Sequence, residues 1–328
     1  NIREGGHYAI LATGCARMLI DNVTIKTSRD GINLSQCSDV EIANCHIDAV
    51  RFEDGYPAGG DDAIKLGSDL SLGKARISEN ISVRNCFLAS GCNAIQFGSE
   101  TMAPFRNIRF ENIRIVRAGK AGISITSNDG SVIEGLHFLD ISMEKTFAPI
   151  FIKLSDVARV PAGAYQRGSI RNIRFENIRA TDCYSYFKGR EMPCVIWGKA
   201  DTPISGIAFK NVSIIARGGH PVADADVLPA ENDERFPRHL GTLPAYGWYL
   251  RHVKDIRFTD CEFRVERADG RPAFVINDGE TVVLKNTTLP IGSKCSSRIN
   301  VRNQAKDLAI LNCIGMSDVK ETVSNRNY

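Results

Sequence analysis

Two short segments of the sequence place carboxylates directly ahead of a run that alternates apolar and polar residues. The segments read Ser-Arg-Asp-Gly at 28–31 and Gly-Asp-Asp-Ala at 60–63. A lone aspartate at a strand end is usually solvated. Adjacent acids repel each other, so the neighbouring pair Asp61 and Asp62 indicates a functional role. Three carboxylates brought together can bind a cation or carry out acid–base chemistry. We therefore take Asp30, Asp61 and Asp62 as candidate catalytic residues.

Four segments of this shape align without gaps and predict one strand repeated on successive rungs. Apolar residues fill two columns, which are Ile32, Ile64, Ile95 and Ile123, and Leu34, Leu66, Phe97 and Ile125. Polar residues fill the column between them, namely Asn33, Lys65, Gln96 and Ser124. The alternation predicts one buried face and one face in solvent. Strict alternation would separate Asp61 from Asp30 and Asp62, so all three can meet only if the chain bends where the strand starts.

A second repeat of the form apolar-x-Asn-apolar runs through the whole chain. Its central residue is Asn at 22, 44, 85, 112, 177, 211, 286 and 312, and Asp at 140 and 260. The shortest spacing is 22 residues and the last copies are 26 apart, which suits one turn of a parallel β-helix. No helical pattern fills the gaps, and the leucine-rich signature is absent. The repeat predicts an all-β solenoid, a parallel β-helix, with Asn at turns because Asn tolerates left-handed backbone.

No linker divides the chain, so we expect a single domain over residues 1–328. Excursions at 51–59, 156–167 and 217–244 are predicted to wall the site, because loops on a rigid scaffold concentrate binding residues. The polar tail 317–328 is expected to be poorly ordered. Since residue 1 falls inside a repeat, we expect a processed or truncated product that lacks its first rungs. We expect the protein to be secreted or periplasmic. An open apolar end would invite a partner chain or an upstream segment.

Charge and cysteine content exclude some classes of protein. The net charge of +3 argues against nucleic acid, which usually requires a dense basic patch. No apolar run approaches the ~20 residues of a membrane span. Ten cysteines are present without a CxxC spacing, so we expect neither a metal nor a cofactor. Cysteines at 45, 86, 261 and 313 share one place in the Asn repeat and are interpreted as stacked buried thiols. Cys183 and Cys194 could form a disulfide in an oxidising compartment.

On these motifs the sequence resembles the polygalacturonase-type glycoside hydrolases (glycoside hydrolase family 28). Ser-Arg-Asp-Gly and Gly-Asp-Asp stand where that family has Asn-Thr-Asp-Gly and Gly-Asp-Asp, in the same order and repeat context. The resemblance extends from about residue 8 to 290 and implies a right-handed parallel β-helix. It also implies hydrolysis of a glycosidic bond with inversion, in a pectin-like or related plant or algal poly- or oligosaccharide.

The resemblance assigns a role to each carboxylate. Asp61 is the general acid that protonates the leaving oxygen, while Asp30 and Asp62 hold and deprotonate the attacking water. One carboxyl must then stay protonated while another stays ionised, and crowding of like charges separates their pKa values. An inverting pair should lie roughly 6.5–9.5 Å apart, which leaves room for the water.

The family's basic motif residues are replaced in this chain. Asn93 stands where the family has the His of Gly-His-Gly, and Ser124 and Thr126 stand where it has the Arg and Lys of Arg-Ile-Lys. A galacturonate in the usual pose would lack its charge partners, and charge-assisted bonds are the strong ones. We therefore expect a changed substrate, either a neutral or deoxy sugar at the cleavage point or an acid held by other groups.

Several other residues are candidates for substrate binding besides Asn93, Ser124 and Thr126. Lys65, on the solvent face beside the carboxylates, and Lys153, one rung beyond Thr126, are substitute cations. Gln96, Glu100 and Asp129 also fall near the predicted cleft.

Aromatic and basic residues of later rungs have two interpretations. Trp197, Trp248 and Tyr249 could be sugar-stacking platforms, although aromatic residues in strands more often belong to a core. Arg251 and His252 could reach the cleft and are interpreted as structural.

Three alternatives to an active hydrolase stay open. A polysaccharide lyase on the same scaffold would need a cation site and a basic proton abstractor. A non-catalytic carbohydrate-binding β-helix would need no acid trio. A hydrolase that has lost its activity is compatible with the missing basic residues.

Overall fold

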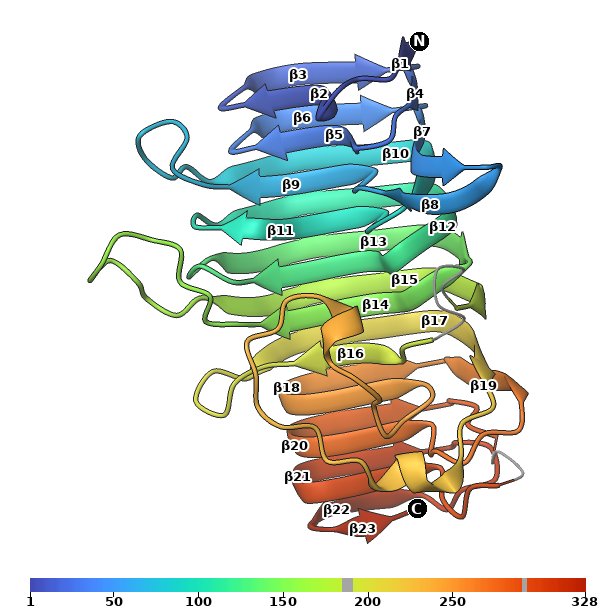
Figure 1. Cartoon of the computed structure of the whole chain (residues 1–328). Coiled ribbons are helices and arrows are strands. Elements are labelled where there is room, and N and C mark those ends of the chain that lie inside the picture. Colours follow the sequence, from blue (N-terminus) through green and yellow to red (C-terminus); the bar gives the residue numbers. More distant parts are fainter. Residues whose placement is uncertain (185–190, 291–293) are drawn as a thin grey trace.

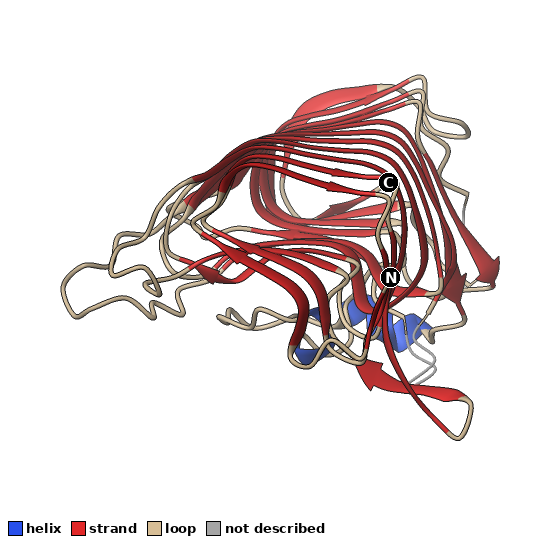
Figure 2. Cartoon of the chain, turned by 90° about the horizontal axis from the view of Figure 1, so that it is seen from above, coloured by secondary structure: helices blue, strands red, loops and turns tan. Residues whose placement is uncertain are grey.

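The computed structural model describes residues 1–184, 191–290 and 294–328. The chain is a right-handed parallel β-helix, in which parallel strands stack rung upon rung from the N-terminus to the C-terminus (Figure 1). Viewed along its axis, the coil has strands on three sides and long loops projecting from its corners (Figure 2). The predicted fold class is confirmed. Among the described residues, no helix is long and apolar enough to span a bilayer.

Each face of the coil is a ladder of parallel strands. The face that carries the site consists of β2 (Tyr8–Thr13), β5 (Asp30–Ser35), β9 (Ile64–Ser68), β11 (Ile95–Thr101), the end of β12 (Phe105–Ser127), β14 (Thr146–Leu154), β16 (Cys194–Trp197) and the first parts of β18 (Trp248–Thr259), β20 (Phe274–Lys285) and β21 (Ile299–Leu311).

The other two faces share several long strands, which turn a corner without a break. The second face consists of β3 (Ala16–Asp21), β6 (Ser38–Ala43), the first parts of β10 (Ser78–Ser90), β12, β13 (Val132–Glu144), β15 (Ser169–Cys183) and β17 (Ile204–Gly218), and the last parts of β18, β20 and β21. The third face consists of β1 (Ile2–Arg3), β4 (Thr24–Lys26), β7 (His46–Glu53), later parts of β10, β12, β13, β15 and β17, and β19 (Glu262–Arg267).

The rungs stack with the register that the sequence columns predict. Ile32 pairs with Ile64, Ile64 with Ile95, and Ile95 with Ile123, and all four side chains are fully buried. The phenylalanines that open five copies of the Asn repeat stack face to face inside the coil, at centroid distances of 4.7–5.4 Å. Stacking of identical buried side chains on successive rungs therefore stabilises the coil.

The Asn repeat marks a left-handed turn on each rung. All ten of its central residues have φ between 50° and 56°, a region that Asn and Asp enter at less cost than other non-glycine residues. Their side chains also bond to one another along the axis: the Asn85 amide donates to Asn44 (3.1 Å), and the Asn112 amide donates to Asn85 (2.8 Å). The interpretation of these residues as structural turn residues agrees with this geometry.

The cysteines of the repeat are buried free thiols, as expected. Each of these four thiols donates to the carbonyl oxygen two residues earlier, as Cys45 does to Ala43 at 3.1 Å. Cys183 and Cys194 are also buried and free, so the structure does not contain the disulfide considered for them.

The segment at 217–244 covers the outer side of the site face beyond β12, as Figure 1 shows in yellow and orange. It contains two short 3-10 helices, η1 (Val222–Asp226) and η2 (Pro237–His239). A second apolar cluster lies under it and includes Phe151, Trp197 and Tyr249. Trp197, Trp248 and Tyr249 are fully buried, so they belong to the core and are not sugar platforms.

The C-terminal tail differs from its prediction as a poorly ordered segment. Residues of 317–328 form β22 (Val319–Val323) and β23 (Arg326–Asn327), both antiparallel to β21. The last rung has an open row of backbone donors and acceptors, and the tail satisfies them despite its polar composition. Val323 contributes to the core from this tail.

Candidate active site

The three predicted carboxylates meet in one cavity of about 470 Å³ on the outer side of β5, β9 and β11. The chain bends where the sequence requires it. Asp61 and Asp62 lie between β8 (Tyr56–Gly60) and β9, outside both strands, and Gly60 has a φ of 123°. A Cβ at Gly60 would lie 2.2 Å from the carbonyl oxygen of Ala49, so only glycine fits this turn.

Asp30 and Asp62 are buried and held in place by hydrogen bonds. The carboxylate of Asp30 accepts from the Asp62 backbone (3.2 Å) and from the Asn33 amide (2.9 Å). The carboxylate of Asp62 accepts from both the backbone and the side-chain amide of Asn93, each at 2.9 Å. The Asn93 carbonyl oxygen in turn accepts from the Ala121 backbone (3.2 Å). Asn93 therefore lines the cavity, but its amide groups hydrogen-bond to Asp62 and hold that carboxylate in position.

Burial and mutual repulsion raise the pKa values of two carboxyls. Desolvation, followed by the charges of Asp62 and Asp61, raises the pKa of Asp30 to about 6. Desolvation and the charge of Asp61 also raise the pKa of Asp62. The site thus contains one carboxyl group, that of Asp30, which changes protonation near neutral pH.

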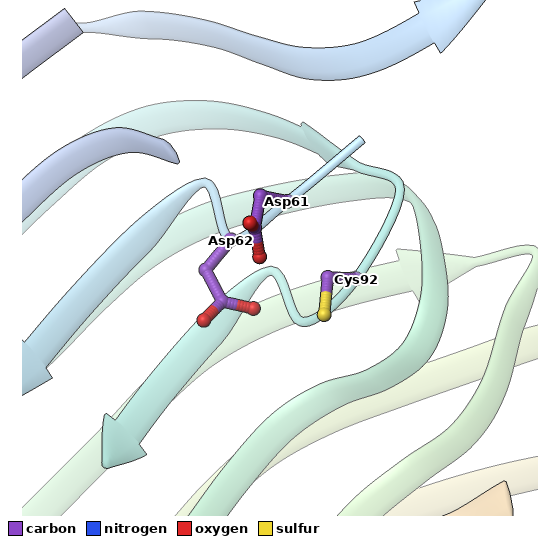
Figure 3. A group of neighbouring side chains, drawn as sticks. All are labelled: Asp61, Asp62 and Cys92. Atoms are coloured by element: carbon purple, nitrogen blue, oxygen red, sulfur yellow. The ribbon is translucent and has the colours of Figure 1, made fainter. Parts of the chain in front are cut away.

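Asp61 is the most exposed member of the trio, with 27% of its side chain accessible. The Arg29 guanidinium lies 3.4 Å from its carboxylate. Figure 3 shows Asp61 and Asp62 on the segment ahead of β9, with Cys92 on the neighbouring turn, and one ligand atom of each lies within 4.8 Å of the others. One carboxylate oxygen of Asp61 and one of Asp62 thus lie closer together than the roughly 6.5–9.5 Å that separates the two carboxyls of an inverting pair.

The group of Asp61, Asp62 and Cys92 has oxygen and sulfur donors that could hold a divalent cation. A thiol must lose its proton to bind a metal. Burial and the charge of Asp62 raise the pKa of Cys92 well above its usual value, which opposes metal binding. The protein's own cations, Lys65 and Lys120, instead offset the carboxylate charge at Asp62.

One side of the cavity is closed by an ion-pair network. Lys65 lies 3.2 Å from Glu100, and Arg159 bonds both Glu100 (2.9 Å) and Asp129 (2.6 Å). Burial opposes ionisation of Lys65, but Glu100, Asp30 and Asp62 outweigh it and raise its pKa. Burial would raise the pKa of Glu100, yet Lys65 and its other partners lower it to about 2. The network is therefore fully charged, and its cations are already neutralised.

The structure separates the predicted substrate-binding residues into two groups. Lys65, Asn93, Gln96 and Glu100 line the cavity with the carboxylates, whereas Ser124, Thr126, Asp129 and Lys153 are buried and do not line it. The Lys153 ammonium donates to the Asn232 carbonyl oxygen (2.8 Å) beneath the 217–244 segment. Burial and Lys199 lower its pKa to about 8. Lys153 is thus an anchor for that segment in this structure.

Gln96 is a buried cavity residue whose side-chain carbonyl oxygen has no partner among the described residues. Its amide nitrogen donates to the Phe97 carbonyl oxygen (2.8 Å). Its Oε1 has no hydrogen-bond partner within the described ranges, although the side chain is only 2% exposed and lines the cavity.

Several residues of the site were not assigned a role from the sequence. Arg29, Lys120 and Phe236 line the cavity, and Arg159 supports it. The Lys120 ammonium lies 4.3 Å from the Phe236 ring centre. Lys120 directly precedes the aligned strand of its rung, which is a usable signal, whereas Phe236 and Arg159 come from long loops.

Arg251 and His252 are structural, as interpreted. Both contact Glu231 of the 217–244 segment, at 2.5 and 2.7 Å, and His252 also contacts Asp278 at 2.7 Å. They fasten the segment to the coil several rungs away from the carboxylates.

Comparison with known families agrees with this architecture. The profile described as glycosyl hydrolases family 28 matches residues 1–230. The chain belongs to glycosyl hydrolases family 28. Within this family 28 chain, the match includes all three cavity carboxylates and the first part of the 217–244 segment, and it ends before Phe236. No curated protein sequence matches it significantly.

Several solved structures match the chain at low sequence identity. A family 28 exopolygalacturonase of Yersinia enterocolitica superposes with a TM-score of 0.53 at 16% identity, over 89% of this chain and 43% of that one. This family 28 chain thus spans less than half the length of that relative. The A-module of the mannuronan C-5 epimerase AlgE4 of Azotobacter vinelandii matches at 9% identity and a TM-score of 0.49, over 89% and 68% of the two chains. The endo-xylogalacturonan hydrolase of Aspergillus tubingensis matches at 10% identity and a TM-score of 0.38, over 99% and 93%.

Proposed function

We propose that this family 28 protein is a glycoside hydrolase that cleaves a pectin-like or related plant or algal poly- or oligosaccharide with inversion. The convergence of Asp30, Asp61 and Asp62 in one cavity carries the proposal. Asp61, the accessible carboxyl, protonates the leaving oxygen. Asp30 and Asp62 hold the attacking water and take its proton, and the pKa of Asp30, raised to about 6, allows it to accept that proton near neutral pH.

We propose further that the sugar at the cleavage point is neutral or deoxy. The cavity is lined by five carboxylates, Asp30, Asp61, Asp62, Asp69 and Glu100, against three cations, Arg29, Lys65 and Lys120. A uronate would enter a field of its own sign, and Lys65 is already paired with Glu100.

The decisive experiment measures reducing ends released from a panel of pectic and related polysaccharides. The panel includes polygalacturonate and polymers with neutral sugars at their branch or backbone linkages. Wild type is compared with Asp61→Asn and with Asp69→Asn, which removes a charge from the same cavity outside the proposed trio. We expect release from a polymer with a neutral sugar at the cleaved bond. Asp61→Asn should lower the rate by about 10²–10⁴-fold, and Asp69→Asn should leave it within a few-fold.

Each other outcome contradicts a stated part of the proposal. Cleavage of polygalacturonate alone would overturn the neutral-sugar assignment. An unsaturated product absorbing in the ultraviolet would indicate a lyase. Saccharide binding without release, unchanged in Asp61→Asn, would indicate a binding protein. The anomer formed first, followed by proton NMR, tests inversion independently of substrate choice.

A further inference from the structure

A second hollow, of about 510 Å³, lies beside the catalytic cavity and has the opposite charge. Its lining includes Arg217, Arg238, Arg267 and Arg271, together with His220, against a single acid, Glu191. The catalytic cavity has an excess of carboxylates. Two neighbouring hollows of opposite sign on one face select different parts of a ligand.

The acidic groups at the floor of this hollow are already satisfied. Arg271 is only 1% exposed and is bound by Asp269 (3.0 Å) and Glu191 (2.8 Å). The same carboxylates accept from backbone groups, Glu191 from Gly218 (3.0 Å) and Asp269 from His220 (3.3 Å). The negative charge of Glu191 and Asp269 is therefore balanced by Arg271 and by backbone donors, and it does not neutralise the arginines at the rim of the hollow.

The rim arginines keep their positive charge available. Within the described part of the chain, Arg217, Arg238 and Arg267 form no ion pair with a carboxylate. Arg217 lies over the Tyr184 ring at 4.5 Å, and Arg238 bonds the His239 ring at 3.2 Å. His220 faces Asp224 (2.7 Å) and Glu191 (3.8 Å), so it adds little to the positive field.

The hollow lies on the same edge of the site face as the catalytic residues. Asp62 bonds Asn93 on the next rung, Asn93 bonds Ala121 on the rung after it, and Ala121 pairs with Ala148. Phe147 precedes Ala148 and lines the hollow, as does Met192, whose backbone bonds Phe147. Three to four rungs at ~4.8 Å each separate the carboxylates from this near edge of the hollow, which is roughly 14–19 Å along the axis; Arg217 and Arg267 lie on later rungs.

The 217–244 segment contributes side chains to both sites and so connects them. Lys120 and Phe236 lie at the near end, where both line the catalytic cavity. Arg238 follows Phe236 by two residues and lines the second hollow. A chain of several linked sugars that leaves the carboxylates along this edge passes Lys120 and Phe236 and then meets the arginines.

We propose that this hollow is a remote subsite that binds a uronate carboxylate of the substrate, several sugars away from the cleaved bond. The inference rests on the proposed hydrolase function for its choice of ligand. Guanidinium groups bind carboxylates through paired hydrogen bonds, so three arginines around one hollow favour a carboxylated sugar over a neutral one. The preferred substrate then carries a neutral sugar at the carboxylate trio and an acidic sugar at the arginines.

Binding of trigalacturonate, measured by calorimetry in the Asp61→Asn background, tests the subsite without requiring cleavage. We expect the Arg217→Gln, Arg267→Gln double variant to bind trigalacturonate at least tenfold more weakly, and Arg238→Gln to weaken it separately. Arg264→Gln removes an exposed arginine on the same strand as Arg267, paired with Glu262, and should change the affinity less than twofold. Thermal unfolding of each variant shows whether it is folded.

Two further binding measurements identify the chemical group that the hollow recognises. The carboxyl-reduced trisaccharide should bind at least tenfold more weakly than trigalacturonate, and inorganic phosphate should compete only at much higher concentration than trigalacturonate. Unchanged binding in the double variant, or phosphate competing as well as the saccharide, would overturn the subsite. Trigalacturonate binding that depends on these arginines, with no release from any polysaccharide, would instead refute the proposed hydrolysis and leave the subsite in place.

Discussion

Asp30 is a buried carboxyl with a raised pKa, and this gives a prediction at the scale of a single residue. If it takes the proton of the attacking water, it must be ionised in the free enzyme. Since its pKa is about 6, kcat/KM should rise as the pH rises through about 6, with an acidic limb near that value. Asp30→Asn should abolish activity at every pH. The measurement is the pH profile of kcat/KM for wild type and for Asp69→Asn, and the acidic limb near pH 6 should persist in Asp69→Asn. An acidic limb near pH 4 in the wild-type profile would contradict the assignment to Asp30.

The same pKa shift predicts how stability changes with pH. The folded pKa of Asp30 lies above the ordinary value of 3.8, so the fold favours the protonated carboxyl. Its stabilising contribution is fully present below about pH 4 and is lost as the pH rises through 6. The Tm of wild type relative to Asp30→Asn should therefore fall between pH 4 and 7. Thermal unfolding across that range measures it, and a rising difference would show that the fold favours the ionised carboxyl and lowers the pKa of Asp30.

Asn93 occupies the place of a family histidine but acts here on Asp62. Both of its donors bond one carboxylate oxygen, so it is a positioning residue. Removing the side-chain amide in Asn93→Ala should lower kcat by about 10²-fold, because small displacements of a reacting group have effects of this size, with KM changed little. Steady-state kinetics separates the two constants. A large increase in KM at unchanged kcat would instead indicate direct substrate binding.

At the scale of elements, the Asn ladder combines a backbone requirement with a chain of hydrogen bonds. Asn85 has a φ of 55° and bonds Asn44 and Asn112. Asn85→Ala loses both, at about 1–2 kcal/mol for the left-handed conformation and about 0.5–1.5 kcal/mol for each hydrogen bond. Asn85→Gly loses only the bonds, so it should be clearly more stable than Asn85→Ala in urea unfolding. Equal stability of the two variants would show that the conformation costs nothing there.

The sequence predicts the elements whose positions follow from a repeat. Ile32, Ile64 and Ile95 could be aligned because side chains alternate with period two and each rung repeats the one before it, and the structure pairs them in that register. The same reasoning brings Asp30 and Asp62 together, since each precedes an aligned strand. The bend at Gly60 follows from the requirement that Asp61 join them.

The sequence does not predict which side chains the long loops place at the site. Arg159 reaches Asp129, and Phe236 reaches Lys120, only because 156–167 and 217–244 fold back onto the coil through specific hydrogen bonds and ion pairs. No period fixes those paths. Lys153 lies in the column predicted for it, but the 217–244 segment covers it, so its column alone did not reveal its surroundings.

At the scale of the whole molecule, a solenoid is held together by contacts between neighbouring rungs, so its ends matter most. At the C-terminal end, β22 and β23 run antiparallel to β21 and bond its free edge. Val323 is 7% exposed and packs into the core there. An open edge of this kind pairs readily with another chain, so the tail stabilises the last rung and also blocks edge-to-edge association.

Removing residues 317–328 should therefore have two effects. It exposes apolar residues of the last rung, including Leu308 and Ile310, which are fully buried in the intact chain, so the Tm should fall by several degrees. It also opens the backbone edge of β21, so the truncated chain should associate as its concentration rises. Val323→Asp should reproduce the lower Tm, whereas Lys320→Gln, on an exposed residue of the same strand, should behave as wild type. Thermal unfolding and sedimentation measure the two effects; a truncated chain that keeps the wild-type Tm and remains monomeric would show that the rungs before β22 are stable without a cap.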